Sequence, residues 1–134
     1  MNRKMIAYTL GRVFLAEFFL MIPAVIVGLI YKESEALSFA LPMAILLVAG
    51  LIFGMKKPQN TVIYVRDGFF IVAAAWIFMA LVGAVPFYLC GHFESVWDCI
   101  FEMVSGFTTT GATVLKDPGA LPKCILFWRS FSHW

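Results

Sequence analysis

Three long apolar runs, separated by short polar segments, dominate the pattern of hydrophobic and polar residues along the chain. The runs cover residues 13–31, 36–55 and 68–89. At about 1.5 Å per residue, each is long enough to cross a hydrocarbon core about 30 Å thick as a helix. The pattern therefore predicts three membrane-spanning helices, the first of them with a kink at Pro23 because proline removes a backbone donor.

The polar segments between the runs predict how these helices connect. Residues 32–35 form only a short polar turn, so the second helix is expected to return antiparallel beside the first. Residues 61–66 alternate like a strand, but the chain offers no partner strand. We interpret them as an interfacial segment that leads into the third helix.

A shorter amphipathic run follows at residues 95–105. As a helix it would be about 16 Å long, which is half of a membrane crossing. Ser95 and Asp98 have the Ser-x-x-Asp spacing of a helix start, and Gly106 is placed where a glycine ends a helix. The run predicts a re-entrant half-helix whose partly negative C-terminal end points toward the membrane centre.

Residues 105–113 read Ser-Gly-Phe-Thr-Thr-Thr-Gly-Ala-Thr, a composition that favours neither helix nor strand. In a membrane, such backbone is tolerated only where it is buried in protein or lines a watery cavity. Glycine permits dihedrals that turn carbonyl groups toward one axis, and threonine adds oxygen without charge, as a dehydrated cation requires. We therefore predict an ion-selectivity filter in which main-chain oxygens bind the ion, with Thr108 at the inner edge and Thr113 at the outer edge. The predicted ion-binding residues are Thr108, Thr109, Thr110, Gly111, Ala112 and Thr113.

Composition supports a membrane protein. Of the 134 residues, 62% are hydrophobic and 13% are charged, whereas soluble domains have about a quarter charged residues. Arg3 and Lys4 precede the first apolar run as in a signal peptide, but no small-residue cleavage pattern follows, which favours a retained helix. The three cysteines fit no metal-binding spacing and are expected to be small packing residues.

The positions of the charges predict an orientation. Lysine and arginine gather before the first run and between the second and third, whereas acidic residues dominate after the third. Because cytoplasmic loops are rich in lysine and arginine, the N-terminus is predicted to be cytoplasmic. The filter loop then reaches the outer face.

Two acidic residues fall inside apolar segments. Glu17 is expected to lie near the start of the first span, where Arg12 or a neighbouring helix satisfies it; a functional role is the alternative, because ionisable residues are rare inside a span. Glu102 in the half-helix needs a partner as well, and Arg129 in the following segment is the candidate.

These motifs resemble the Trk/Ktr/HKT superfamily of potassium transporters. Residues 93–98 and 105–113 are similar to the first pore loop of that superfamily, and residues 121–134 to the start of the helix after it. Residues 67–69, Trp76 and residues 83–87 are similar to the helix before it. The two additional N-terminal apolar runs resemble the TrkH-type branch.

The resemblance implies an all-α membrane protein. An N-terminal transmembrane helix pair at residues 1–57 would precede the first helix–pore-loop–helix repeat at residues 58–134, truncated in its last helix. The complete fold of the family has four such repeats, so the chain is expected to be an N-terminal fragment. In the family, glycine at position 111 accompanies potassium and serine accompanies sodium permeation.

The function implied by the resemblance is potassium uptake across the cytoplasmic (inner) membrane by the ion-translocating subunit of a Trk-type system. The implied partners are the lipid bilayer, the remaining repeats, a second copy in a homodimer and a cytoplasmic nucleotide-binding regulatory subunit. Potassium is then the transported substrate, with no cofactor and no metal site beyond the filter.

Two alternatives remain from the residues alone. The chain can be part of a broken-helix secondary transporter that binds another small solute at residues 106–111, or a complete small membrane protein that assembles with partners. An enzyme and a nucleic-acid-binding protein are not expected, because the sequence has neither a nucleophile–base constellation nor a basic patch.

Overall fold

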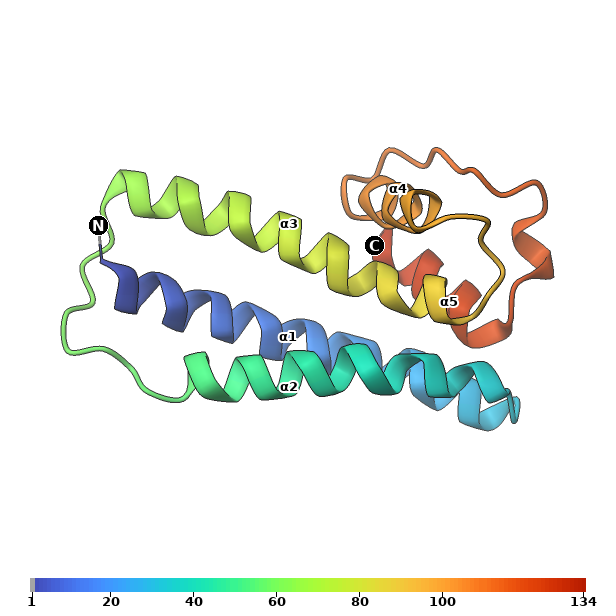
Figure 1. Ribbon diagram of the computed structural model, residues 1–134, viewed down its shortest axis with the longest axis horizontal. Helices are drawn as coiled ribbons and strands as arrows, with labels where there is room; N and C mark the ends of the chain where they lie inside the picture. Colours follow the sequence, from blue (N-terminus) through green and yellow to red (C-terminus); the bar gives the residue numbers. More distant parts are fainter. Residues whose placement is uncertain (1) are drawn as a thin grey trace.

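The computed structural model describes residues 2–134, in which every regular element is helical. The α-helices are α1 (Arg3–Ile30), α2 (Ala40–Gly54), α3 (Val65–Leu89), α4 (Val96–Phe107) and α5 (Lys123–Ser132), with 3₁₀ turns η1 (Ser34–Phe39) and η2 (Pro118–Ala120). Helices α1, α2 and α3 form an elongated bundle, and α4 and α5 gather at the end away from the N-terminus (Figure 1). The expectation of an all-α chain is confirmed for these residues.

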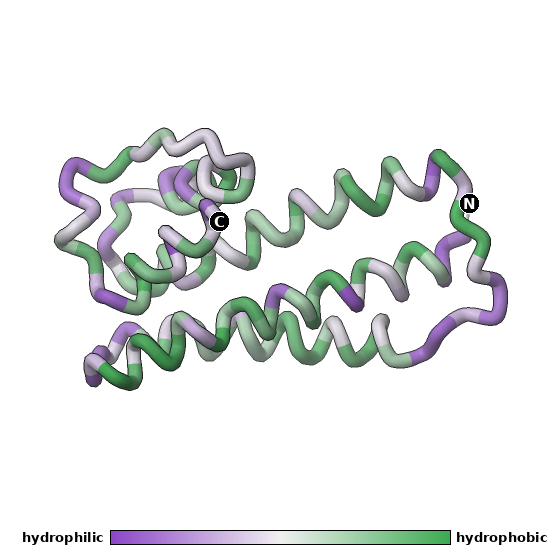
Figure 2. Tube along the Cα trace, turned by 180° about the vertical axis from the view of Figure 1, so that it is seen from behind, coloured by the Kyte–Doolittle hydropathy of each residue, from purple (hydrophilic) through white to green (hydrophobic). Residues whose placement is uncertain are grey.

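Three segments are long and apolar enough to cross a membrane: Arg3–Ile30, Ser34–Gly54 and Val65–Leu89. Figure 2 shows the apolar colouring along them and polar colouring at the turns. Residues 61–64 form no strand before α3 begins. The hydropathy pattern therefore located all three candidate spans, and the expectation of no strand before the third is confirmed. The interfacial position of this connection stays a prediction.

Helix α1 begins ten residues before the first apolar run. Asn2 caps it, since its side-chain oxygen accepts a hydrogen bond from the N–H of Met5 at 3.2 Å. The helix then continues through Pro23 to Ile30. Hydropathy marks where the helix enters apolar surroundings, whereas the cap marks where the helix starts.

Helices α1 and α2 approach each other through glycines. A Cβ atom added to Gly11 would lie 2.4 Å from the backbone nitrogen of Gly54, and one added to Gly50 would lie 2.6 Å from the side chain of Leu15. Small residues are the usual means of close helix packing in membranes, where van der Waals contact replaces the hydrophobic driving force.

Helix α4 packs against the C-terminal half of α3. Its first residue, Val96, borders the same cavity as Tyr88 near the end of α3. Its last residue, Phe107, packs edge-to-face on Trp76 near the middle of α3, with ring centroids 6.4 Å apart. With 12 residues, against 25 in α3, α4 is about half as long as a candidate membrane span.

The start of α4 is as predicted, but its end is not. The Ser95 hydroxyl accepts a hydrogen bond from the N–H of Asp98 at 3.2 Å. The prediction that Gly106 ends the helix is wrong, because α4 continues to Phe107. Gly106 instead allows close packing: a Cβ there would lie 2.2 Å from the Ser132 hydroxyl at the end of α5.

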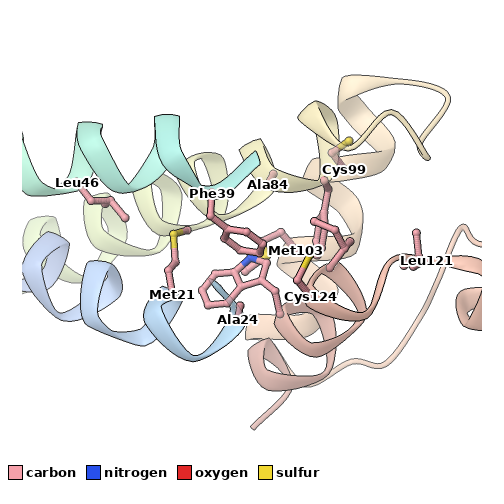
Figure 3. Packing of buried hydrophobic residues seen from close by; sticks show 12 residues of the cluster. Met21, Ala24, Phe39, Leu46, Ala84, Cys99, Met103, Leu121 and Cys124 are labelled. Atoms are coloured by element: carbon pink, nitrogen blue, oxygen red, sulfur yellow. The ribbon is translucent and has the colours of Figure 1, made fainter. Parts of the chain in front are cut away.

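The core lies where the bundle meets α4 and α5. Its buried members are Met21, Ala24, Phe39, Leu46, Ala84, Phe87, Cys99, Met103, Leu121, Cys124, Ile125 and Trp128, most of them labelled in Figure 3. The indole N–H of Trp128 donates to the carbonyl of Gly83 at 3.0 Å, and its ring packs edge-to-face on Phe39. Cys99 and Cys124 are buried free thiols that pack as expected.

Candidate ion-selectivity loop

The threonine-rich loop follows α4 directly, and every residue of the predicted filter is exposed in it. The exposed stretch runs without interruption from Thr108 to Val114. After it, the chain passes through η2 and re-enters the helical region as α5, whose last turn packs against the end of α4. The structure thus brings the six predicted residues together on one continuous surface.

Two residues of the loop have left-handed backbone conformations. Gly111 has a φ of 78°, and Thr109 has a φ of 55°. A β-branched residue in this region is strained, and such strain concentrates at functional sites. Gly111 is one of the few positions in the chain where glycine is required by the backbone itself.

The amide groups of the loop point back to α4. The N–H of Thr108 donates to Val104, that of Thr109 to Gly106 and that of Thr110 to Ser105, at 2.9, 2.9 and 3.0 Å. Within residues 2–134, no hydrogen bond reaches the carbonyl oxygens at positions 109, 110 and 111. These oxygens are therefore free to accept a cation.

The Ala112 carbonyl is held differently from its neighbours. The Ser105 hydroxyl donates to it at 2.6 Å, which ties the outgoing part of the loop to the last turn of α4. The threonine hydroxyls also bond locally. Thr108 donates to the Val104 carbonyl at 2.7 Å, and its oxygen lies 2.8 Å from that of Thr110.

The buried side chain of Glu102 contacts the C-terminal part of the loop from the protein interior. Its side chain is fully buried on α4. The Thr113 hydroxyl lies 3.0 Å from each of its oxygens, and the Val114 N–H donates to one of them at 3.2 Å. Arg129 on α5 forms an ion pair with the same carboxylate, which confirms the partner suggested by the sequence.

The contacts of Glu102 with the loop were not predicted. Thr113 lies eleven residues after Glu102, a spacing that matches no local motif. The unmatched acidic residue in an amphipathic helix was the only signal in the sequence. This signal suggested Arg129 alone, whereas the carboxylate contacts Thr113, Val114 and Arg129.

Glu33 is a second carboxylate that joins distant segments, and its contacts with the start of α5 were not predicted either. Its two carboxylate oxygens accept hydrogen bonds from the backbone N–H groups of Lys123, at 2.6 Å, and Cys124, at 2.9 Å. Pro122 offers no side-chain cap, so Glu33 caps this helix from the α1–η1 turn. Burial favours the neutral acid, but the N–H groups of Cys124 and Lys123 outweigh it and hold the pKa of Glu33 below its ordinary 4.5.

Glu17 lies elsewhere than predicted. It occupies the middle of α1, is fully buried, and neither of its oxygens has a hydrogen-bond partner among residues 2–134. The pairing with Arg12 is therefore wrong: the two residues are five apart, which places them on different faces of a helix. Glu17 borders a cavity of about 280 Å³ that also touches Thr109 and Trp128.

Comparison with known proteins identifies the family of the chain. Residues 34–134 match the family model TrkH, described as a cation transport protein. The chain belongs to the TrkH family of cation transport proteins. A crystal structure of the potassium transporter TrkH from Vibrio parahaemolyticus superposes with a TM-score of 0.89 at 31% identity, over 98% of this chain and 29% of that one.

Sequence comparison with proteins of other organisms supports the same family assignment. The chain is 34% identical to an uncharacterized cation transporter, MJ1485, of Methanocaldococcus jannaschii, over 92% of this chain and 26% of that protein. It is 35% identical to the Trk system potassium uptake protein TrkG of Escherichia coli, over 82% of this chain and 23% of that protein. It is 32% identical to the Trk system potassium uptake protein TrkH of Halomonas elongata, over 100% of this chain and 28% of that protein.

The TrkH-family chain thus spans about a quarter of the length of the relatives that it matches. Its relatives are transport proteins rather than enzymes. The three helices able to span a membrane agree with membership of a family described as cation transport proteins.

Proposed function

We propose that this chain contributes one wall of a potassium-selective pore in a Trk-type uptake system of the cytoplasmic membrane. The observation that carries the proposal is the set of free carbonyl oxygens at Thr109, Thr110 and Gly111, exposed side by side after a half-depth helix. Carbonyl oxygens replace the hydration shell of a potassium ion in such filters.

The surroundings of the loop suit a cation. The carbonyl ends of helices carry partial negative charge, and α4 ends directly at Thr108. Glu102 adds a fixed carboxylate behind the loop, where its pairing with Arg129 leaves little net charge to trap the ion. The loop can therefore attract an ion and still release it.

The same proposal assigns the remaining parts of the chain. Residues 1–57 form the N-terminal helix pair, and residues 58–134 form the first helix–pore-loop–helix repeat. Further repeats of a longer protein supply the other walls, a second copy forms the homodimer, and a cytoplasmic nucleotide-binding subunit regulates transport. The N-terminus faces the cytoplasm; thiol labelling of single cysteines at positions 57 and 117 tests this, and equal labelling from outside would refute it.

Substitution of Gly111 in the full-length protein tests the filter. Because Gly111 has a positive φ and nothing within 4 Å of an added Cβ, Gly111→Ser adds backbone strain and a hydroxyl without a clash. We expect rubidium uptake to fall and preference for potassium over sodium to decrease.

The chain provides a matched control for this substitution. Gly91 has a φ of 74° and equally open surroundings but lies outside the loop. Gly91→Ser imposes the same kind of strain, about 1–2 kcal/mol, and should leave ion preference unchanged. Equal selectivity of the two variants would refute the assignment of Gly111 to the filter.

A further inference from the structure

Two adjoining cavities, one polar and one apolar, lie along the N-terminal half of α1. The polar cavity, of about 700 Å³, lies between the start of α1, the end of α2 and the segment after it. The apolar cavity, of about 390 Å³, lies between α1, α2 and α3. Ala7 and Phe53 line both, so the two cavities adjoin each other.

The polar cavity is positively charged. Lys4, Lys56 and Lys57 line it, and no acidic side chain does. The Glu102–Arg129 pair is the one salt bridge among residues 2–134, so these three lysines have no carboxylate partner there. Three unpaired ammonium groups at one end of membrane-spanning helices complement a phosphate-bearing headgroup.

The wall of the polar cavity is held in place by hydrogen bonds. The side-chain amide of Asn2 donates to the carbonyl of Asn60 at 2.8 Å and to that of Val62 at 3.2 Å. The backbone N–H of Asn2 donates to Asp67 at 3.2 Å. The segment that carries Lys56 and Lys57 is thereby anchored to the start of α1, beside Lys4.

The apolar cavity has the chemistry of a site for part of a lipid chain. All of its lining residues are apolar, and they include the Phe14–Phe78 ring pair, whose centroids are 5.9 Å apart. From Ala7 to Phe14, the part of α1 that lines the cavity rises about 10 Å. This length accommodates part of one acyl chain, which extends through one leaflet, about half of a hydrocarbon core.

We propose that these adjoining cavities bind an anionic phospholipid, with its phosphate between Lys4, Lys56 and Lys57 and one acyl chain along α1, α2 and α3. The proposal does not depend on ion transport, because no residue of the threonine-rich loop lines either cavity. The lipid would connect three helices that otherwise diverge at this end (Figure 1).

Lipid titration into the purified chain in detergent micelles tests the proposal, with bound lipid counted by native mass spectrometry. Dioleoyl phosphatidylglycerol should bind much more tightly than dioleoyl phosphatidylcholine, which has the same chains but no net charge. The triple variant K4Q/K56Q/K57Q should lose about a hundredfold in affinity for the anionic lipid, since each lysine contributes about fivefold. The variant K32Q/K116Q/K123Q removes the same charge at distant positions and should bind normally.

Two further arms test the apolar part and the source of the phosphate. Dihexanoyl phosphatidylglycerol and inorganic phosphate should both bind far more weakly to the unmodified chain than the dioleoyl lipid, and Ala49→Phe, which fills the apolar cavity, should weaken dioleoyl binding. Equal affinity for the charged and uncharged lipids, or an unchanged affinity in the cavity triple variant, would overturn the proposal. Tight binding of inorganic phosphate would show that the site binds anions in general and not a lipid. If the full-length protein bound no lipid there, the cavities would be occupied by another segment of that protein, and the proposal would be wrong.

Discussion

The hydroxyl of Thr113 lies 3.0 Å from both carboxylate oxygens of Glu102. One O–H group donates to one oxygen at a time, so the contact persists as the hydroxyl turns between them. It connects the end of the exposed loop to a fully buried side chain on α4. The shape of the loop is thus set from the protein interior rather than by the loop residues alone.

Glu102→Gln should therefore disturb both stability and ion selection. The amide has the same size, but its NH₂ group faces donors from Thr113, Val114 and Arg129. Breaking a buried ion pair costs about 3–5 kcal/mol when one charge is left alone. We expect a lower thermal unfolding midpoint of the purified chain and reduced potassium preference in rubidium uptake by the full-length protein.

A double-mutant cycle separates the ion pair from the loop contact. Glu102→Gln/Arg129→Gln removes both charges and should recover part of the lost stability but not the ion preference. Glu94→Gln, an exposed acidic residue near the start of α4, should change neither property. Additive losses in the double variant would contradict a direct pair.

Protonation of Glu33 should loosen the start of α5. The pKa of Glu33 in the folded chain is below its ordinary value of 4.5, so the unfolded chain binds this proton more readily. The stabilisation by the Glu33 carboxylate is therefore complete above about pH 4.5, the ordinary pKa of the group. It is lost as the pH falls through the lower pKa of the folded chain. Glu33→Gln should cost about 1 kcal/mol at neutral pH, as loss of a helix cap does, and should flatten the acidic limb of a stability–pH curve.

The measurement is thermal unfolding in micelles from neutral pH to pH 3. Glu94→Gln makes the same change of charge without a backbone contact and should keep the acidic limb of the parent. An acidic limb unchanged by Glu33→Gln would show that other carboxylates cause it.

The elements of the fold were largely predictable because each leaves a local trace in the sequence. Three apolar runs gave the spans, and Ser95 with Asp98 gave the start of α4. The start of α1 was missed by ten residues because Asn2 caps a stretch that is helical but not uniformly apolar. The end of α4 was missed because the sequence does not reveal that Gly106 faces Ser132.

The sequence singled out residues 108–113 as the candidate filter, which stays a prediction, but it did not reveal the contacts that support this loop. Glycine and threonine composition marked residues 108–113, because backbone that must present carbonyl groups has few permissible residues. Its supports, Glu102 with Thr113 and Glu33 with Lys123, join residues far apart in sequence through contacts that have no periodic signature. Glu17 and Arg12 show the converse error, since proximity in sequence suggested a pair that the helix geometry does not allow.

Replacement of Glu17 by methionine should stabilise the chain. The buried carboxyl has no partner among residues 2–134, and burying such a group costs about 1–3 kcal/mol. Methionine fills a similar volume without that cost. We expect a higher thermal unfolding midpoint for Glu17→Met than for the parent.

Leu20→Met is the control, because Leu20 borders the same cavity but is already apolar. It should leave the midpoint nearly unchanged. A lower midpoint for Glu17→Met would indicate that the carboxyl makes a favourable contact in solution.

The isolated 134 residues should not conduct potassium. A filter replaces hydration water with oxygens from all sides, and one loop supplies one side only. Liposomes that contain the purified chain should show no potassium flux above empty liposomes, with the full-length protein as the positive arm. Selective, saturable flux from the chain alone would mean that several copies assemble into a pore.

The hydrogen bonds from Lys123 and Cys124 to Glu33 also have a consequence for biosynthesis. Glu33 precedes Lys123 by 90 residues, so the turn that carries Glu33 is synthesised before α5. The acceptor for the first N–H groups of α5 is therefore already present when that helix leaves the ribosome.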